Sequence, residues 1–398
     1  MFPGKPIIER CAQDTTTRLR MKYSPYYHVV AAANGAQVMV EGRPMVMMSS
    51  NEYLGLSRHP KVVAAVKAAA DEWGASSCGS RLANGSRAYH AELEAALADF
   101  LGVEACQVLS AGYLACVASL SSLVQRGDAL IVDPVIHSAL WDGALLSGAK
   151  LERFAHEDMG ALAKLLEELD AKQAKAIVVD GVYSMAGHVA SLPKICDLAD
   201  QFGAALIVDD AHGLGILGRD GRGTCDHLGV TGRVDLIAGS FSKALASTGG
   251  FIAGSRVLIE YLRSHSRQII FSAAISPMAA AAARTALDVM QTEPEHRKRL
   301  WANYHYLRGI LENLGVDYWQ SPTPALPIVV GAKEKCYWIW KSLWEAGFFT
   351  VMSLAPGVPA GKELIRVAVT SEHTKEQLDR FGGALKAAMK SAGFRANQ

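Results

Sequence analysis

The sequence predicts an α/β protein whose large domain contains a mostly parallel, doubly wound sheet and is followed by a smaller α+β domain. Over residues 103–241, short apolar stretches typical of strands alternate with amphipathic stretches typical of helices. After about residue 290 the pattern changes to a long charged helix, two strands and a closing helix. A chain of 398 residues is also too long for a single small hydrophobic core, which favours more than one domain.

The individual elements follow from hydrophobic periodicity. Strands are expected at 103–110, 129–134, 174–184, 204–211 and 234–241. Helices are expected between or before them, at 61–73, 89–101, 161–173 and 192–203. Regular alternation of this kind favours a parallel sheet with helices on both faces. In such sheets ligands bind beyond the carboxyl ends of the strands, so the residues there are the candidates for chemistry.

Three regions are expected along the chain. Residues 1–47 form an N-terminal arm that ends in a hairpin around Glu41-Gly42-Arg43-Pro44. Residues 48–290 form the large domain, and residues 291–398 form the small C-terminal domain.

Composition excludes several classes of protein. Forty basic and 39 acidic residues give a net charge of +1, without the positive excess of a nucleic-acid-binding protein. No apolar run is long enough to cross a membrane, and charges interrupt the N-terminus where a signal peptide is apolar. Seven cysteines without a Cys-x-x-Cys pair predict neither a disulfide framework nor a metal site. We therefore expect a cytoplasmic protein with reduced thiols and no metal.

Two strand ends carry an aspartate and a lysine that suit pyridoxal 5′-phosphate (PLP). Asp209 ends the strand at 204–211, and Lys243 follows the next strand, 34 residues later. One βαβ step places both beside one ligand. A lysine can hold PLP as a Schiff base, and an aspartate can keep its pyridine nitrogen protonated. Taken alone, a lysine after a strand, such as Lys243, is usually a solvated surface residue, and Asp209 could equally be a helix cap.

Other strand ends add to this pattern. Ser110-Ala111-Gly112-Tyr113 precedes a helix, where small residues expose backbone amides to a phosphate. His137 follows the strand at 129–134, and Asp180 to Ser184 end the strand at 174–184. Gly213, Gly215 and Gly218 match G-x-G-x-x-G, but a loop rather than a helix follows them, which argues against a dinucleotide site.

Nine blocks of the sequence, taken in order along the chain, resemble those of the α-oxoamine synthases. These enzymes are a subfamily of the fold-type I, aminotransferase-like PLP enzymes. The resemblance covers about residues 48–375. The blocks are SSNEYLGLSRHP, GSRLANGSRAYHAELE, SAGYLAC, HSALWDG, DGVYSMAGHVASL, VDDAHGLGILGRDGRG, GSFSKALASTGGFIAG, FSAAISP and IRVAVTSEHT.

The resemblance implies roles for individual residues. Lys243 would bind PLP and take the α-proton, Asp209 would pair with the pyridine nitrogen, and His212 would bond the ring hydroxyl. His137 would stack on the ring. The resemblance also implies contacts to the phosphate, by Ser110, Gly112, Tyr113, Ser240 and the partner subunit's Ser272. Ser184 would contact the cofactor and lie near the substrate, and Asn51 and Arg366 would contact the substrates.

The implied reaction joins a small L-amino acid (alanine, serine or glycine) to an acyl thioester of CoA or a carrier protein. It releases CO2 and free thiol and gives an α-amino ketone, in a homodimer. Asp180 stands where the family often has Glu, Ala186 and His188 stand where it often has Asp, and Ser272-Ala273 replaces Ser-Thr. These departures leave the acyl specificity open, although two blocks are more similar to the serine palmitoyltransferase-like members.

Two alternatives remain at this point. An ordinary aminotransferase would form a keto acid without consuming a thioester. A noncatalytic partner subunit would typically lack the lysine, whereas Lys243 is present.

Overall fold

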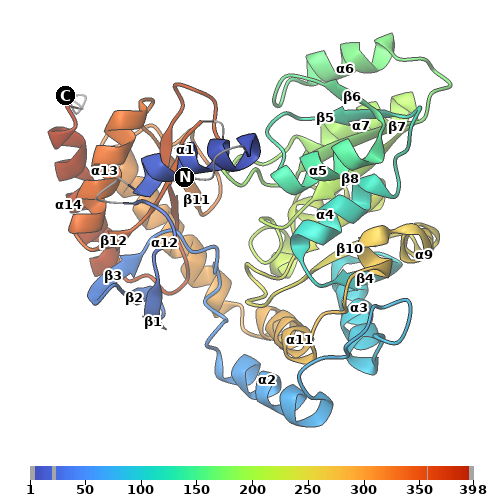
Figure 1. Ribbon diagram of the computed structural model, residues 1–398, viewed down its shortest axis with the longest axis horizontal. Helices are drawn as coiled ribbons and strands as arrows, with labels where there is room; N and C mark the ends of the chain where they lie inside the picture. The colour runs from blue at the N-terminus through green and yellow to red at the C-terminus, as the bar shows by residue number, and fades with distance from the viewer. Residues whose placement is uncertain (1–4, 20–23, 356, 394–398) are drawn as a thin grey trace.

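The computed structural model describes residues 5–19, 24–355 and 357–393. The chain forms two lobes that lie side by side (Figure 1). The larger lobe is built around a central sheet, and the smaller lobe contains segments from both ends of the chain.

The central sheet has seven strands in the order β4-β10-β9-β8-β7-β5-β6. Four neighbouring pairs are parallel, and only β10 runs antiparallel to both of its neighbours among these strands. Strands β5, β7 and β9 are buried along their whole length, which explains why their sequences are mostly apolar. The strands are β4 (Ala105–Leu109), β5 (Ala129–Val132), β6 (Lys150–Arg153), β7 (Lys175–Asp180), β8 (Ala204–Asp209), β9 (Leu236–Ser240) and β10 (Gly250–Gly254).

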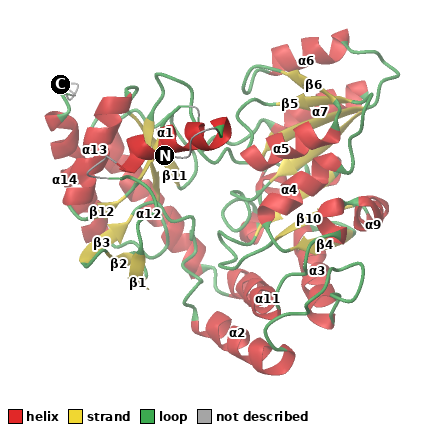
Figure 2. Ribbon diagram, in the orientation of Figure 1, coloured by secondary structure: helices red, strands yellow, loops and turns green. Residues whose placement is uncertain are grey.

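The helices of the larger lobe mostly flank this sheet, although α2 (Pro60–Trp73) packs against α11 (Pro277–Thr292) instead (Figure 2). They are α2 (Pro60–Trp73), α3 (Ala88–Leu101), α4 (Gly112–Ser121), α5 (Ser138–Ser147), α6 (Met159–Glu168), α7 (Leu192–Phe202), α8 (Thr224–His227), α9 (Arg256–His265), α10 (Arg267–Ile270) and α11 (Pro277–Thr292), with 3-10 turns η1 (Arg219–Gly221) and η2 (Thr231–Arg233). Among the described residues, no helix is long and apolar enough to span a membrane.

The smaller lobe contains two further sheets, with strand orders β1-β2-β3-β12 and β11-β14-β13. Their strands are β1 (Val30–Asn34), β2 (Gln37–Val40), β3 (Arg43–Met47), β11 (Ala325–Val329), β12 (Phe348–Phe349), β13 (Val351–Ser353) and β14 (Leu364–Ala368). The C-terminal helices are α12 (Glu295–Asn313), α13 (Lys333–Glu345) and α14 (Lys375–Ser391), and α1 (Pro6–Leu19) lies near the N-terminus.

The hairpin expected in the N-terminal arm is formed by β2 and β3. Its turn places Glu41 at φ 51° and Gly42 at φ 76°, the left-handed conformation of a tight two-residue hairpin turn. Strand β3 then pairs with β12, with Val46 opposite Phe348. Val46 and Phe348 belong to one buried apolar cluster with residues of α12, α13 and α14. The end of the N-terminal arm therefore packs as part of the smaller lobe. The domain boundaries expected at residues 47 and 290 stay predictions.

Candidate active site

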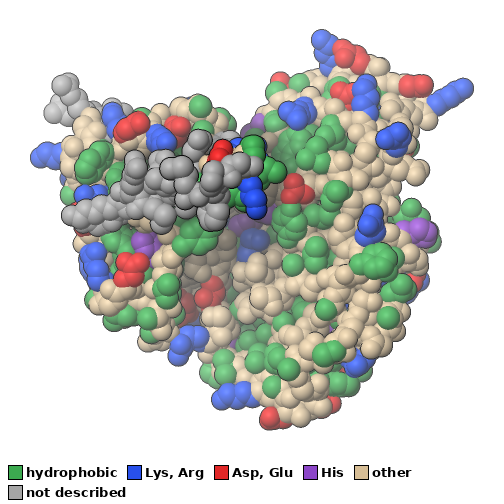
Figure 3. Space-filling model, in the orientation of Figure 1, with side chains coloured by type: hydrophobic (Ala, Val, Ile, Leu, Met, Phe, Trp, Pro, Cys, Tyr) green, Lys and Arg blue, Asp and Glu red, His purple; other side chains and the backbone are tan. Residues whose placement is uncertain are grey.

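A cavity of about 430 Å³ lies beyond the carboxyl ends of the central strands. Most of its walls come from residues that directly follow β4, β5, β7, β8 and β9. On the face shown in Figure 3, the surface is hollowed between the two lobes. The lining residues are Ser110, Ala111, Gly112, Tyr113, Cys116, His137, Asp180, Val182, Asp209, Ala211, His212, Ser240, Ser242, Lys243, Thr248 and Gly249.

One end of the cavity is formed by the first turn of α4. Ala111 is extended, with φ −151°, and the helix begins at Gly112. A Cβ on Gly112 would lie 2.7 Å from both Cβ and Oγ of Ser240, so a larger residue would push α4 away from β9. The first amides of a helix have no partner within the helix and favour an anion. This end therefore suits a phosphate group.

Asp209 is held in a fixed orientation at the end of β8. Its side chain is buried, and Oδ1 accepts a hydrogen bond from the Ala211 amide at 3.0 Å. The Cys116 thiol donates to Oδ2 at 3.1 Å. Burial and the charge of Asp209 raise the pKa of Cys116 well above its usual value, so the thiol keeps the proton that it donates.

A second buried carboxyl, Asp180, lies next to Asp209. The two residues are register partners in the parallel pair β7 and β8. Burial first, and then the charge of Asp209, raise the pKa of Asp180 well above its usual value. Asp180 Oδ1 accepts a hydrogen bond from the His137 amide at 3.1 Å. His137 caps α5, since its Nδ1 accepts from the Ala139 amide at 3.2 Å.

His212 is a neutral imidazole with one nitrogen already bonded. Its Nδ1 lies 2.8 Å from the hydroxyl of the buried Tyr53. Burial, with the nearby charges of Lys243 and Arg366, lowers the pKa of His212 well below its usual value. Burial also raises the pKa of Tyr53, so the phenol keeps its proton. The second imidazole nitrogen remains available to a ligand in the cavity.

Lys243 follows β9 and is half-buried at the wall of the cavity. Burial lowers the pKa of its amine, and the charge of Arg366 adds to this effect, while Asp209 and Cys116 oppose it. An amine with a lowered pKa is more often unprotonated, and therefore more nucleophilic toward a carbonyl group.

Arg366, in β14 of the smaller lobe, is buried with part of its guanidinium unused. Its Nε donates to the Ser184 carbonyl at 2.8 Å. Its buried Nη2 has no hydrogen-bond partner among the residues that the structure describes, and the same holds for Asn51 Oδ1. Leaving a buried charged donor unpaired is costly, so Arg366 is suited to an anionic ligand.

Comparisons with known proteins agree with this geometry. The family Aminotransferase class I and II matches residues 43–385. The chain is 39% identical to a serine palmitoyltransferase of Sphingobacterium spiritivorum, over 89% of each chain. It is 40% identical to 8-amino-7-oxononanoate synthase 1 of Bacillus velezensis, over 91% of this chain and 92% of the relative.

Solved structures of serine palmitoyltransferases are also similar to this chain. A serine palmitoyltransferase of Sphingomonas wittichii superposes with a TM-score of 0.91 at 32% identity, over 97% of each chain. Another serine palmitoyltransferase structure, which contains PLP, has a TM-score of 0.91 at 31% identity, over 98% of each chain. The chain belongs to the aminotransferase class I and II family. Within it, the protein is a PLP-dependent α-oxoamine synthase, as the resemblance implied.

The cavity of the synthase fits PLP at both ends. Gly112 lets the start of α4 pack closely on Ser240, and the first amides of this helix suit a phosphate. At the other end, Asp209 presents a buried, oriented carboxylate of the kind that a pyridine nitrogen requires. Lys243 lines the same cavity. The fold and the cofactor predicted from the sequence are thus confirmed.

The structure brings together eight of the residues singled out from the sequence. The cavity of the synthase is lined by Ser110, Gly112, Tyr113, His137, Asp209, His212, Ser240 and Lys243. Asn51, Ser184, Ser272 and Arg366 are not part of its lining. Ser272 Oγ lies 3.2 Å from Ser110 Oγ of its own chain, so a contact with a partner subunit's phosphate stays a prediction.

Two residues that hold site residues of the synthase in place, Cys116 and Tyr53, had been given no role from the sequence. Cys116 holds Asp209 and Tyr53 holds His212, yet their positions 93 and 159 residues away leave no local signal. Spacing within α4 could only have shown that Cys116 lies one helical turn after Gly112.

Proposed function

We propose that this α-oxoamine synthase acts as a homodimer that condenses a small L-amino acid (alanine, serine or glycine) with an acyl thioester of CoA or of a carrier protein. The products are an α-amino ketone, CO2 and the free thiol. Support comes from relatives named as serine palmitoyltransferase and 8-amino-7-oxononanoate synthase. The buried and unused Nη2 of Arg366 carries the proposal, because it calls for a carboxylate.

Different residues would contact different parts of the PLP molecule. The amides of Gly112 and Tyr113, with Ser110 and Ser240, would bind the phosphate. Asp209 would bind the pyridine nitrogen, His212 the ring hydroxyl, and His137 the ring face. When bound, PLP supplies an electron sink for the negative charge that develops at the α-carbon of the amino acid.

Lys243 would attach the cofactor and then move the α-proton. Burial lowers the pKa of its amine, so the free amine is a better base near neutral pH than an exposed lysine. Burial and the charge of Asp209 raise the pKa of the neighbouring Asp180 well above its usual value. Lys243 would return a proton to the α-carbon once CO2 has left.

Arg366 would hold the carboxylate of the amino acid. The Ser184 carbonyl fixes the guanidinium through Nε at 2.8 Å, which leaves Nη2 for the substrate. Ser184 and Asn51 would then lie beside the substrate and the thioester carbonyl. Because β14 belongs to the smaller lobe, a bound carboxylate would connect the two lobes.

Product analysis with alanine, serine and glycine, each paired with a series of acyl-CoA thioesters, tests the proposal. We expect CO2 and free thiol in equal amounts with at least one pair. Formation of a keto acid without thiol release would contradict the proposed reaction and would indicate transamination.

The position of Lys243 gives a direct prediction. Lys243→Ala removes the amine that would bind PLP covalently, so we expect loss of the visible absorbance of the bound cofactor and of turnover. Borohydride reduction followed by peptide mapping should label Lys243 in the unmodified enzyme. Labelling of a different lysine would contradict the assignment.

A further inference from the structure

A second group of side chains, outside the cavity, consists of His156, Glu157 and His188. His156 and Glu157 follow β6, and His188 lies in the loop after β7. His156 Nε2 is 3.3 Å from His188 Nδ1, and Glu157 Oε2 is 3.8 Å from the same His188 nitrogen. One ligand atom of each residue lies within 4.8 Å of the others.

The Asp133 carboxylate determines which nitrogen of the His156 ring carries the hydrogen. His156 Nδ1 lies 3.0 and 2.8 Å from the two oxygens of Asp133, a buried carboxylate that can only accept. The same carboxylate accepts hydrogen bonds from the Val135 amide and the Tyr183 hydroxyl, each at 2.9 Å. His156 Nδ1 therefore carries a hydrogen, and a neutral ring has its lone pair on Nε2.

His188 is fixed in the same way by a backbone carbonyl. Its Nε2 lies 3.3 Å from the Trp319 oxygen, which accepts and never donates, so Nε2 carries the hydrogen. A neutral His188 then has its lone pair on Nδ1. The two facing nitrogens, 3.3 Å apart, thus both present lone pairs and need a cation between them.

Distance and charge indicate which cation fits. Two ligands about 2.0–2.1 Å from a tetrahedral zinc ion lie roughly 3.3–3.4 Å apart, which matches the separation of 3.3 Å between the histidine nitrogens. Asp133 and Glu157 place two carboxyl groups around the two imidazole rings. Glu157 also adopts φ 55°, a left-handed conformation that is unusual for this residue type.

We propose that His156, Glu157 and His188 bind a zinc ion, and that Asp133 and the Trp319 carbonyl orient the two imidazoles. A two-histidine, one-carboxylate set leaves a fourth position for water, as in zinc sites that keep an open position. The two acceptors behind the rings are the outer partners that metal-bound histidines usually have.

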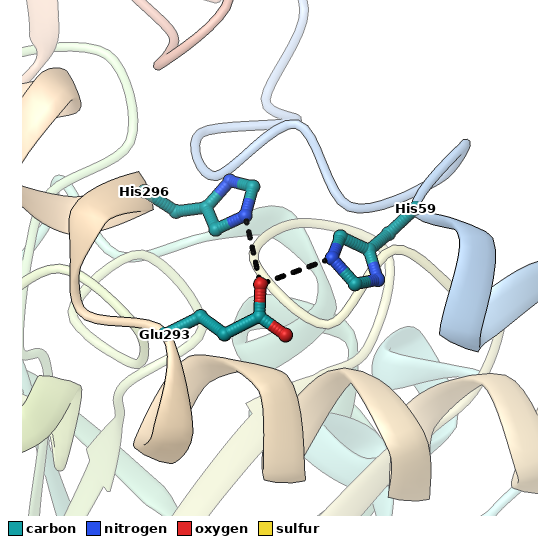
Figure 4. A group of neighbouring side chains, drawn as sticks. All are labelled: His59, Glu293 and His296. Carbon is teal, nitrogen blue, oxygen red and sulfur yellow. Dashed lines mark hydrogen bonds and ion pairs between the residues drawn. The ribbon is translucent and has the colours of Figure 1, made fainter.

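A second cluster with the same residue types provides the matched control (Figure 4). There, Glu293 already contacts two partners, Lys61 at 2.8 Å and His59 at 3.3 Å. Arg299 lies 3.0 Å from His296 Nδ1, which places another positive charge beside the group. If His59 Nε2 bound a metal, the hydrogen would move to its buried Nδ1, which has no acceptor among the described residues. These contacts disfavour zinc.

Calorimetric titration of the PLP-loaded enzyme with zinc chloride tests the proposal. We expect one zinc ion per chain at this site. His188→Asn and Glu157→Gln should each weaken binding, His188→Asn by at least about 100-fold, more than loss of an outer partner typically costs. His59→Asn should leave the affinity unchanged.

Four outcomes would overturn the proposal: no zinc binding by the unmodified enzyme, unchanged binding in both Glu157→Gln and His188→Asn, loss of binding in His59→Asn, or binding through the exposed thiols Cys11 and Cys78 alone. Glu157 is half-exposed, so Glu157→Gln keeps the test open if His188→Asn fails to fold.

Discussion

At the level of single residues, the site depends on buried polar groups whose partners are only partly supplied by the protein. Asp209 has two fixed donors, whereas Arg366 Nη2 has no partner among the described residues. On the proposed function, the first arrangement would hold a permanently bound cofactor, and the second would bind a substrate that enters and leaves. This difference separates the residues expected to affect PLP binding from those expected to affect the amino-acid KM.

Arg366→Lys should raise the amino-acid KM roughly tenfold or more, because an ammonium cannot supply two parallel hydrogen bonds to a carboxylate. The thioester KM should change much less. Steady-state kinetics with each substrate varied in turn measures both. Arg233→Lys, at an exposed arginine paired with Asp197 and Asp200, is the control and should change neither. Equal increases in both constants for Arg366→Lys would instead indicate that Arg366 organises the closed enzyme.

A buried histidine in the smaller lobe predicts how stability depends on pH. His373 Nδ1 accepts from the Thr370 amide and Nε2 bonds the Met47 carbonyl, each at 3.0 Å, so only the neutral ring satisfies both. Burial lowers its pKa to about 4. The unfolded chain binds a proton below about pH 6.5 while the folded chain does not, so stability is lost as the pH falls from there toward 4.

By pH 5 this loss should reach about 2 kcal/mol relative to pH 7. Urea unfolding at both pH values measures it. His373→Gln, which cannot gain a proton, should show a smaller pH dependence, and His265→Gln, at an exposed histidine, should behave as the parent. The same pH dependence in His373→Gln and the parent would rule out His373 as the source.

At the level of elements, the junction between α4 and β9 determines where the phosphate would sit. Gly112 allows close contact because its Cα packs directly on Ser240, and Gly250 of β10 also packs against it. A Cβ on Gly250 would lie 2.5 Å from Gly112 Cα. Three elements therefore meet at one position where no side chain fits.

Gly112→Ala should weaken PLP binding at least about tenfold, because the new methyl group would lie 2.7 Å from Ser240 and displace the start of α4. Gly309→Ala is the matched control: no atom lies within 4 Å of its added Cβ, and alanine should stabilise α12 by up to about 1 kcal/mol. Fluorescence titration of the apoenzyme with PLP measures the affinity. Unchanged affinity in Gly112→Ala would exclude the phosphate from this position.

At the scale of the whole molecule, two neighbouring loops expose apolar side chains beside the site. Phe271 is 80% exposed and Leu82 is 61% exposed, which is costly for a monomer in water. Their loops pair through Ser80 and Ala273, and Ser272 lies against Ser110 at the edge of the cavity. A second copy covering these loops would bury the exposed side chains close to the active site.

We therefore expect light scattering to give the mass of a homodimer, and Phe271→Glu to weaken it. Mixing Lys243→Ala with Ser272→Asp chains distinguishes a shared site from an independent one. If Ser272 serves the partner's phosphate, the mixture should recover about a quarter of full activity, since half of the dimers are mixed and each has one intact site. No recovery would mean that Ser272 serves its own chain, and a monomeric mass at full activity would contradict the dimer.

The sequence by itself determined the alternation of elements and the positions of the residues at strand ends. Strands β5, β7, β8 and β9 were predicted because buried parallel strands are continuous apolar runs, a signal carried by adjacent residues. Asp209 and Lys243 followed from the same signal, since each comes where a run stops. Local patterns of this kind do not require knowledge of the rest of the chain.

Only the tertiary structure decided which distant residues meet. Strand β6 is a short, partly exposed edge strand, and β10 is bounded by glycines, so neither has a distinctive period. The pairing of β3 with β12 and the contact of Cys116 with Asp209 join segments far apart in sequence. The facing lone pairs of His156 and His188 arise because Asp133 and Trp319, on separate segments, orient each ring. Such contacts depend on packing free energy summed over the whole chain, which no local spacing records.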